Sequence, residues 1–173
     1  MTEMTVAARW ALLADTVRAM AQAATAAEVV ALAHAAARRI ARADGITIVK
    51  RIGEETDYLA EDTVEPLWTG LQFPIDKCLA GRAMTEERTI VVPDITHVED
   101  IPLNVYLATF IRSLVAVPIG DHPPTHAICA YWRETGPIDP NAVALFEALA
   151  RGIGAGFALV EIADLAARNG GAA

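Results

Sequence analysis

A chain of 173 residues is long enough for one domain with a sizeable core, and 54% hydrophobic against 21% charged residues excludes intrinsic disorder. The formal net charge of −8 disfavours nucleic acid and anionic membranes, so we expect neither as a partner. Two cysteines make no disulfide scaffold and the N-terminus lacks a secretory pattern, so we expect a cytoplasmic domain.

The first two segments are predicted to be helices. The first, over residues 5–23, carries an apolar stripe at helical spacing: Trp10, Leu13, Val17 and Met20. Thr25 and Glu28 form a capping-box pattern, with threonine as the N-cap and glutamate reaching back to it. A second helix should therefore begin here and end near Gly45.

After Gly45 the hydrophobic period becomes alternating, which is typical of strands. Residues 45–62 predict a β-hairpin. The following elements are expected in order: a strand at 71–75, a helix at 78–87, a strand at 88–95, a helical turn within 98–110, and paired strands at 112–119 and 126–134. The last two should be central antiparallel strands, since prolines and a glycine dictate a turn between them.

A long helix should close the chain. Asp139 suits its N-cap and Pro140 its first position. Its apolar positions again recur at helical spacing: Phe146, Leu149, Ile153, Phe157 and Val160. The elements together predict one α+β domain with an antiparallel sheet, long helices on one face and smaller helices over the other.

Four stretches in this order resemble a GAF domain. They are "FPIDKCLAGRAM", "TIVVPDI", "DIPLNVYLATFIRSLVAVPI" and "AICAYW", and the resemblance covers roughly residues 25–165. The combination looks most like GAF domains that precede the kinase modules of bacterial two-component sensors. It implies a GAF/PAS-like sheet of about six strands. We expect a helix within 1–23, a GAF core over 25–165 and a frayed tail at 166–173.

The resemblance implies a non-catalytic sensory module with a pocket for an unknown small molecule. We expect this pocket to be lined by Phe73, Cys78, Asp100, Tyr106, Phe110, Arg112, Ser113 and Tyr131. The alternative stays open that the aromatic residues are ordinary core and that Arg112 pairs with an acid. The output would be a histidine kinase, if the natural chain is longer, or a separate partner.

The two apolar helix stripes predict a homodimer. GAF domains often dimerise through their terminal helices, and each stripe looks too wide for one sheet face to cover. The dimer residues would be Trp10, Leu13, Val17, Met20, Phe146, Leu149, Ile153 and Phe157.

Cys78 has two interpretations. Its place at a predicted helix start beside Lys77 would lower a thiol pKa, which suits a nucleophile and a redox enzyme like the free methionine sulfoxide reductases. Those enzymes also need a cysteine in the loop after the Pro-Asp motif, and the corresponding loop after Pro93-Asp94 has none. Cys78 could instead be a small residue at the helix cap. Cys129, in an apolar strand, is expected in the core.

Other GAF chemistries find little support in the residues. The Asn-Lys pair of cyclic-nucleotide-binding members and the Cys-His pair of many bilin-binding members are both absent, although Asp100 to Pro102 is similar to a segment that lines phytochrome pockets. His122 and His126 are separated by prolines that forbid a helical metal site, and His97 lies in an acidic loop. We therefore expect no catalytic residue and no metal.

Overall fold

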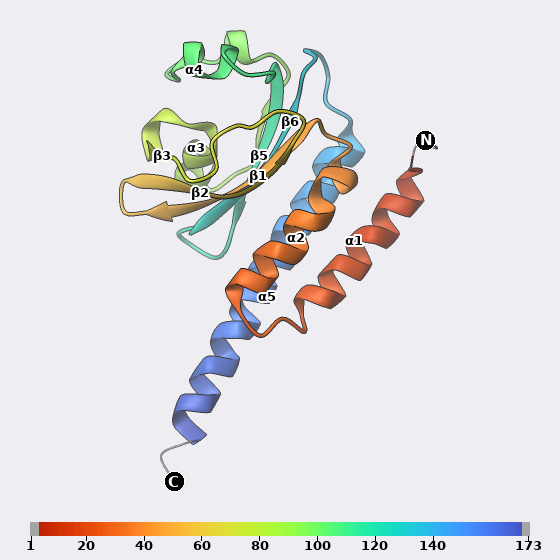
Figure 1. Cartoon of the computed structure of the whole chain (residues 1–173), viewed down its shortest axis with the longest axis vertical. Helices are drawn as coiled ribbons and strands as arrows, with labels where there is room; N and C mark the ends of the chain where they lie inside the picture. The colour runs from red at the N-terminus through yellow and green to blue at the C-terminus, as the bar shows by residue number, and fades with distance from the viewer. Residues whose placement is uncertain (1–3, 171–173) are drawn as a thin grey trace.

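Six strands form one antiparallel sheet within residues 4–170, the part of the chain that this computed structural model describes (Figure 1). The strand order is β3-β2-β1-β6-β5-β4, and all neighbours run antiparallel. The strands are β1 (Gly45–Ile52), β2 (Glu55–Thr63), β3 (Gln72–Pro74), β4 (Ile90–Val92), β5 (Ser113–Ile119) and β6 (His126–Trp132). The predicted α+β class and sheet are confirmed.

Long helices cover one face of this sheet (Figure 1). They are α1 (Val6–Met20), α2 (Ala26–Ala41) and α5 (Pro140–Gly170). α2 and α5 pack on the strands, and α1 packs against both of them as an outer helix. Arg9 fastens α1 there: it is fully buried, its Nε donates to the Ile40 carbonyl at 2.8 Å, and its Nη1 contacts the Asp139 carboxylate at 3.1 Å.

The predicted helix starts are confirmed in detail. The Thr25 hydroxyl accepts a hydrogen bond from the Glu28 N–H at 3.1 Å, and the Glu28 carboxylate accepts one from the Ala24 N–H at 2.6 Å. At α5, the Asp139 carboxylate accepts from the Asn141 N–H at 2.9 Å. The Glu28 and Asn141 N–H groups lie in the first turns of α2 and α5 and lack a partner within those helices, which is why Thr25 and Asp139 open them. The Glu28 carboxylate differs from the prediction, because it reaches the Ala24 N–H and not that of Thr25.

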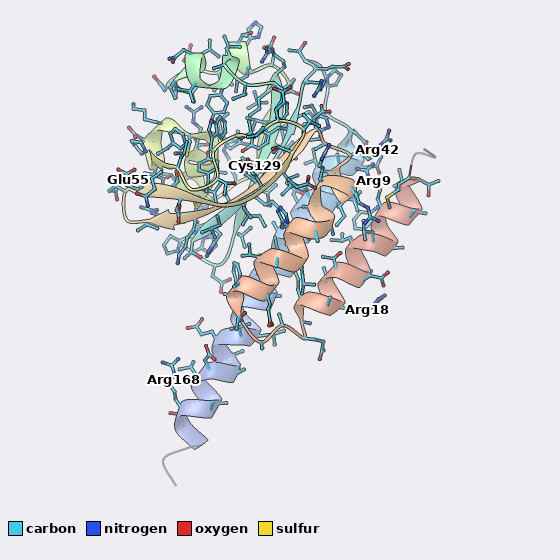
Figure 2. All side chains as sticks on the ribbon, viewed as in Figure 1. Arg9, Arg18, Arg42, Glu55, Cys129 and Arg168 are labelled. Carbon is cyan, nitrogen blue, oxygen red and sulfur yellow. The ribbon has the colours of Figure 1, made fainter. Side chains whose placement is uncertain are left out.

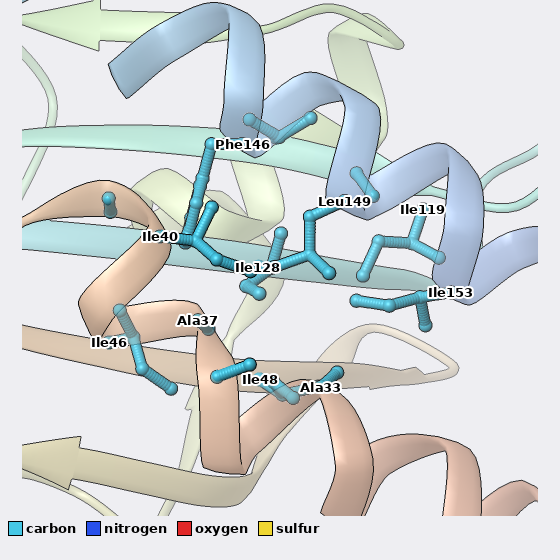
Figure 3. Packing of buried hydrophobic residues seen from close by; sticks show 14 of the residues in the cluster. Ala33, Ala37, Ile40, Ile46, Ile48, Ile119, Ile128, Phe146, Leu149 and Ile153 are labelled. Carbon is cyan, nitrogen blue, oxygen red and sulfur yellow. The ribbon is translucent and has the colours of Figure 1, made fainter. Parts of the chain in front are cut away.

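The helix-face core lies between the sheet and the helices α2 and α5 (Figure 3). Figure 3 shows Phe146 and Leu149 of α5 packed against Ile40 of α2 and Ile128 of β6. This arrangement corrects the predicted interface residues and leaves the homodimer itself a prediction. Five of the residues are buried inside their own chain: Leu13, Met20, Phe146, Leu149 and Ile153. The sheet and the neighbouring helices together cover the stripes. Trp10, Val17 and Phe157 stay partly exposed.

Three glycines bring α5 close to different elements. A Cβ atom on Gly152 would meet the Val17 side chain of α1 at 2.7 Å, and one on Gly156 would meet Val29 of α2 at 3.0 Å. A Cβ atom on Gly154 would lie 3.4 Å from the backbone of Gly120, in the turn between β5 and β6. The glycines therefore let α5 approach two helices and one turn closely.

The C-terminal part of α5 projects beyond the sheet and the other helices (Figure 1). The helix was expected to fray from residue 166, but it continues to Gly170, and residues 161–170 are all exposed. The remaining residues of the predicted tail, 171–173, lie outside the described range, as do 1–3 at the other end. Within that range α5 alone has the length and composition to cross a membrane, with 44% of its most apolar stretch buried in the domain.

Candidate functional site

Short elements cover the other face of the sheet and enclose a second hydrophobic cluster, here called the distal core (Figure 1). These elements are the 3₁₀ turns η1 (Ile75–Lys77) and η2 (Ile95–His97) and the helices α3 (Leu79–Glu86) and α4 (Leu103–Leu107). α3 lies on β5 and β6. It must carry Gly81, since a Cβ atom there would overlap the Ile75 carbonyl. Cys129, labelled in Figure 2, faces this core from β6.

An aromatic cluster fills the space where a GAF pocket was expected. Its members are Tyr58, Trp68, Phe73, Tyr106 and Tyr131. Trp68 is central: its ring centroid lies 5.3 Å from Tyr106, 5.4 Å from Tyr58, 5.9 Å from Phe73 and 6.1 Å from Tyr131, all edge to face. Edge-to-face contacts are a preferred geometry for aromatic rings. A cavity of ≈ 10 Å³ remains, about enough for one water.

Trp68 enters the distal core from an irregular segment, residues 64–71, between β2 and β3. The Glu61 carboxylate holds that segment: it accepts hydrogen bonds from the N–H groups of Leu67 at 3.0 Å, Trp68 at 2.8 Å and Thr69 at 3.0 Å. Partial desolvation raises the pKa of Glu61, but these N–H groups outweigh it, and the pKa lies below its ordinary value. Glu61 therefore holds residues 67–69 of the segment through one ionised side chain. The start of the segment is held separately, by the Val64 N–H on the Asp44 carbonyl at 3.0 Å and the Thr63 hydroxyl on the Glu65 carbonyl at 2.7 Å.

Polar groups inside the distal core satisfy one another. The Tyr131 and Thr47 hydroxyls are 2.7 Å apart, the Tyr106 hydroxyl accepts from the Leu79 N–H at 3.2 Å, and the Thr56 hydroxyl donates to the Phe73 carbonyl at 3.0 Å. Burial raises the pKa values of Tyr106 and Tyr131. Among residues 4–170 the one buried charged side chain is Arg9, which lies on the other side of the sheet. The interior of the site therefore offers hydroxyl groups and aromatic rings, and Lys77 stands at its edge.

Both cysteines are buried free thiols within the described residues. Burial raises the pKa of Cys78, and hydrogen bonds with Thr56 and the Gly81 N–H offset only part of the rise. Burial likewise raises the pKa of Cys129 to about 12. A reactive thiol needs the opposite shift, because the thiolate is the nucleophile. The Cys78 Sγ instead accepts from the Gly81 N–H at 3.3 Å, so Cys78 is the N-cap of α3.

Five predicted pocket residues do meet in the distal core: Phe73, Cys78, Tyr106, Phe110 and Tyr131. Three predicted polar residues do not. Asp100 is exposed on a turn at φ 60°, and the Arg112 guanidinium is occupied by the carbonyls of Thr109 and Ile111 at 2.8 and 2.7 Å. Ser113 lies on the opposite face of β5 and donates to the Glu134 carbonyl at 2.7 Å. The placement of these three residues in the pocket is corrected.

Sequence reasoning missed Trp68 and Tyr58. Tyr58 alternates with exposed residues on β2, which could have placed it on the covered face. Trp68 stands between Pro66 and Gly70 in a stretch with no periodic pattern, so no strand or helix rule applies to it. The one sequence feature that could have identified Trp68 is that a large aromatic residue stands in a turn segment.

Two wider hollows lie outside the distal core. One, of ≈ 290 Å³, contains Ser113 and the loop before α5, and the other, of ≈ 560 Å³, runs between α5 and the turn after β5. Both are open to solvent. Among residues 4–170 no group of three histidine, cysteine, aspartate or glutamate side chains is placed to hold a metal ion.

No protein-family model matches the sequence, and no curated protein matches it. Solved structures do share its fold. The free methionine-R-sulfoxide reductase of Neisseria meningitidis, in complex with its substrate, superposes with a TM-score of 0.80 at 16% identity, covering 94% of this chain and 96% of that one. The GAF domain of an Acinetobacter phosphoenolpyruvate-protein phosphotransferase gives 0.72 at 10% identity, over 92% and 97% of the two chains.

A third structure, the phycoerythrobilin-bound GAF domain of a cyanobacterial phytochrome, gives a TM-score of 0.76 at 14% identity, covering 90% of this chain and 97% of that one. The chain has the GAF fold. Identities of 10–16% show the fold alone, and these GAF-fold proteins include a reductase and a domain that binds phycoerythrobilin.

Replacing Cys78 with serine should change the free energy of unfolding by less than about 1 kcal/mol, because serine is a strongly preferred N-cap and can also accept from the Gly81 N–H. Cys78→Ala removes the acceptor and should cost about 1–2 kcal/mol. Urea unfolding of the wild type, Cys78→Ser and Cys78→Ala measures these free energies. A serine variant as unstable as the alanine variant would contradict a capping role.

Proposed function

We propose that this GAF domain is a sensory or regulatory module of bacterial signal transduction. It binds a small molecule in the distal core, or passes on a change in helix packing, and its output is a kinase or another partner. The observation that carries the proposal is the chemistry of the distal core. Its buried residues supply apolar walls and hydroxyl groups without a charged side chain, an arrangement that suits binding better than catalysis.

The helices provide a route for output. α5 packs on the sheet and on α2, and then continues past the domain with a row of exposed apolar side chains: Leu159, Ile162 and Leu165, which are 45%, 61% and 47% exposed. Spacings of three place them on one side of the helix. We propose that this row, together with the 42% exposed Trp10 of α1, pairs with a second copy of the chain.

Ile162→Glu should split such a dimer without unfolding the domain, because Ile162 makes up the most exposed part of the row and contributes nothing to the core. Ala167→Glu is the matched control, since it adds the same charge on another side of the same exposed helix. Light scattering over a concentration series, with circular dichroism on the same samples, gives the result. A wild type that is monomeric at high micromolar concentration would defeat the dimer.

The sensory proposal is tested by the response of α5 to ligand. Native mass spectrometry of the protein after incubation with fractionated small-molecule extracts identifies a bound mass, and hydrogen exchange then follows the amides of α5. Binding should change exchange in α5. A ligand that binds in the distal core and leaves both α5 and the oligomeric state unchanged would contradict the signalling role.

A second candidate function is the reduction of free methionine sulfoxide, favoured by the fold shared with the Neisseria meningitidis enzyme. The buried Cys78 and Cys129, both with raised pKa values, argue against it. An assay with free methionine-R-sulfoxide and a dithiol reductant distinguishes the reductase from the purely sensory domain. Turnover that disappears in Cys78→Ser or Cys129→Ser would establish the enzyme and overturn the purely sensory proposal.

A further inference from the structure

We propose that residues 64–69 are a gate, that the Trp68 indole is its plug, and that the ligand is a neutral planar aromatic molecule that takes the place of the indole. This inference rests on the proposed sensory function, because it assigns the ligand class and the regulation of the same site. The domain as described is then the closed state.

Residues 64–69 belong to no strand, so strand pairing does not hold Trp68 in the distal core. Val64, Glu65, Pro66 and Thr69 are exposed, and within the segment only Trp68 is buried. Leu67 is partly buried and packs at the edge of the distal core. Moving Trp68 out, together with Leu67 at the edge, opens the space among the four surrounding rings. The mouth lies between Trp68, η1 and α4, where Lys77, Pro102 and Val105 line the small remaining cavity.

The gate has a latch on one side and a hinge on the other. The latch is the Glu61 carboxylate with its three N–H donors. The hinge is Gly70, at φ 80°, which is bonded to the Tyr58 carbonyl at 3.1 Å and has no neighbour within 4 Å of a Cβ position. A positive φ favours glycine, and the open surroundings leave the backbone free to turn. The bonds at Val64 and Glu65 keep the start of the segment in place. Releasing the carboxylate would therefore free residues 66–69, between these bonds and Gly70, to move outward.

The walls define the ligand. Tyr58, Phe73, Tyr106 and Tyr131 present ring edges and faces to the indole, so a flat aromatic ring can make the same contacts. No buried side chain of the distal core carries a charge. An ion would have to give up its hydration without a counter-ion. Lys77, at the mouth, is 56% exposed and stays hydrated, so it supplies no buried counter-ion. A ring without charge is therefore expected.

Cys78 reports on the gate, because it lines the cavity beneath Trp68, whereas Cys129 lies in the central strand β6 and becomes accessible only on wider unfolding. The first experiment labels both thiols with a maleimide and measures each peptide by mass spectrometry. Glu61→Gln should raise the labelling rate of Cys78 about tenfold, since an amide accepts these three bonds less strongly than a carboxylate. The Cys129 rate should not change.

Asp62→Asn is the matched control. It makes the same chemical change on the next residue of β2, where the carboxylate pairs with Arg38 and not with the gate. Its Cys78 rate should equal that of the wild type. Equal rates in all three proteins, or Cys78 and Cys129 rising together in Glu61→Gln, would overturn the gate.

The second experiment titrates indole into the wild type and follows the indole N–H signals of its tryptophans by NMR. Trp68→Phe identifies the signal of Trp68, with Trp10 and Trp132 as internal controls. Indole should shift the Trp68 signal, and should bind Glu61→Gln more tightly, because a larger fraction of that protein is open. Indole-3-acetate and tryptamine, which carry opposite charges, should bind at least about tenfold more weakly.

The outcomes separate the gate from the sensory function. An unmoved Trp68 signal at the solubility limit of indole, or charged analogues that bind as well as indole, overturns the gate and its ligand class. That result leaves a sensory role through another ligand site intact. Displacement of Trp68 with no change in the hydrogen exchange of α5 supports the gate and counts against signalling through the helices.

Discussion

Trp68→Ala should lower the free energy of unfolding by about 3–5 kcal/mol, the usual cost of removing a buried large aromatic side chain. Trp68 is 7% exposed and touches four rings, so its removal leaves a cavity that rigid neighbours cannot fill. Chemical denaturation followed by far-UV circular dichroism measures the change. The fold should persist, because the helix-face core contains none of these residues.

Trp10→Ala is the control for this substitution. It removes the same side chain from a position that is 42% exposed, so it should cost under about 1 kcal/mol at concentrations that keep the protein monomeric. If the two variants lose equal stability, Trp68 does not hold the distal core together, and the segment around it packs only loosely.

Phe146→Ala should also cost about 3–5 kcal/mol, but through the other core. Phe146 is 1% exposed and packs with Ile40 and Ile128 between α5, α2 and the sheet (Figure 3). Since these contacts lie within one chain, the loss in unfolding free energy should not depend on protein concentration. Urea unfolding at two concentrations a hundredfold apart measures both the loss and its independence.

The matched control is Phe157→Ala, eleven positions further along the same helix. Phe157 is only partly buried and stacks on His126 with ring centroids 4.7 Å apart, so its loss should be clearly smaller. A concentration-dependent effect of Phe146→Ala would restore that residue to a dimer interface and would argue against the packing described above.

The elements were predictable because their signals are local. Thr25, Glu28 and Asp139 satisfy backbone groups a few residues away, so the capping rules apply without knowledge of the fold. The alternating pattern after Gly45 located β1, but it did not show that residues 45–49 are buried on both faces. Thr47 and Val49 face the distal core, which segments distant in sequence complete.

The site was less predictable because its residues depend on register and tertiary contacts. Ser113 and Leu114 are adjacent, and alternation along β5 sends them to opposite faces, so a shift of one residue decides which enters the distal core. The Arg112 side chain finds its partners in the carbonyls of its own turn. Trp68 is held by Glu61, seven residues earlier, through contacts with no sequence period.

The exposed end of α5 converts a small tilt of the helix into a larger displacement of its C-terminus. Residues 161–170 form a free helical rod of about 15 Å, at a rise of about 1.5 Å per residue. Gly152, Gly154 and Gly156 allow close approaches of α1, the β5–β6 turn and α2 to α5 within little more than one turn, just before this rod begins. A tilt of about 10° about Gly154 would displace the tip, about 24 Å away, by roughly 4 Å, enough to change how it meets a neighbour.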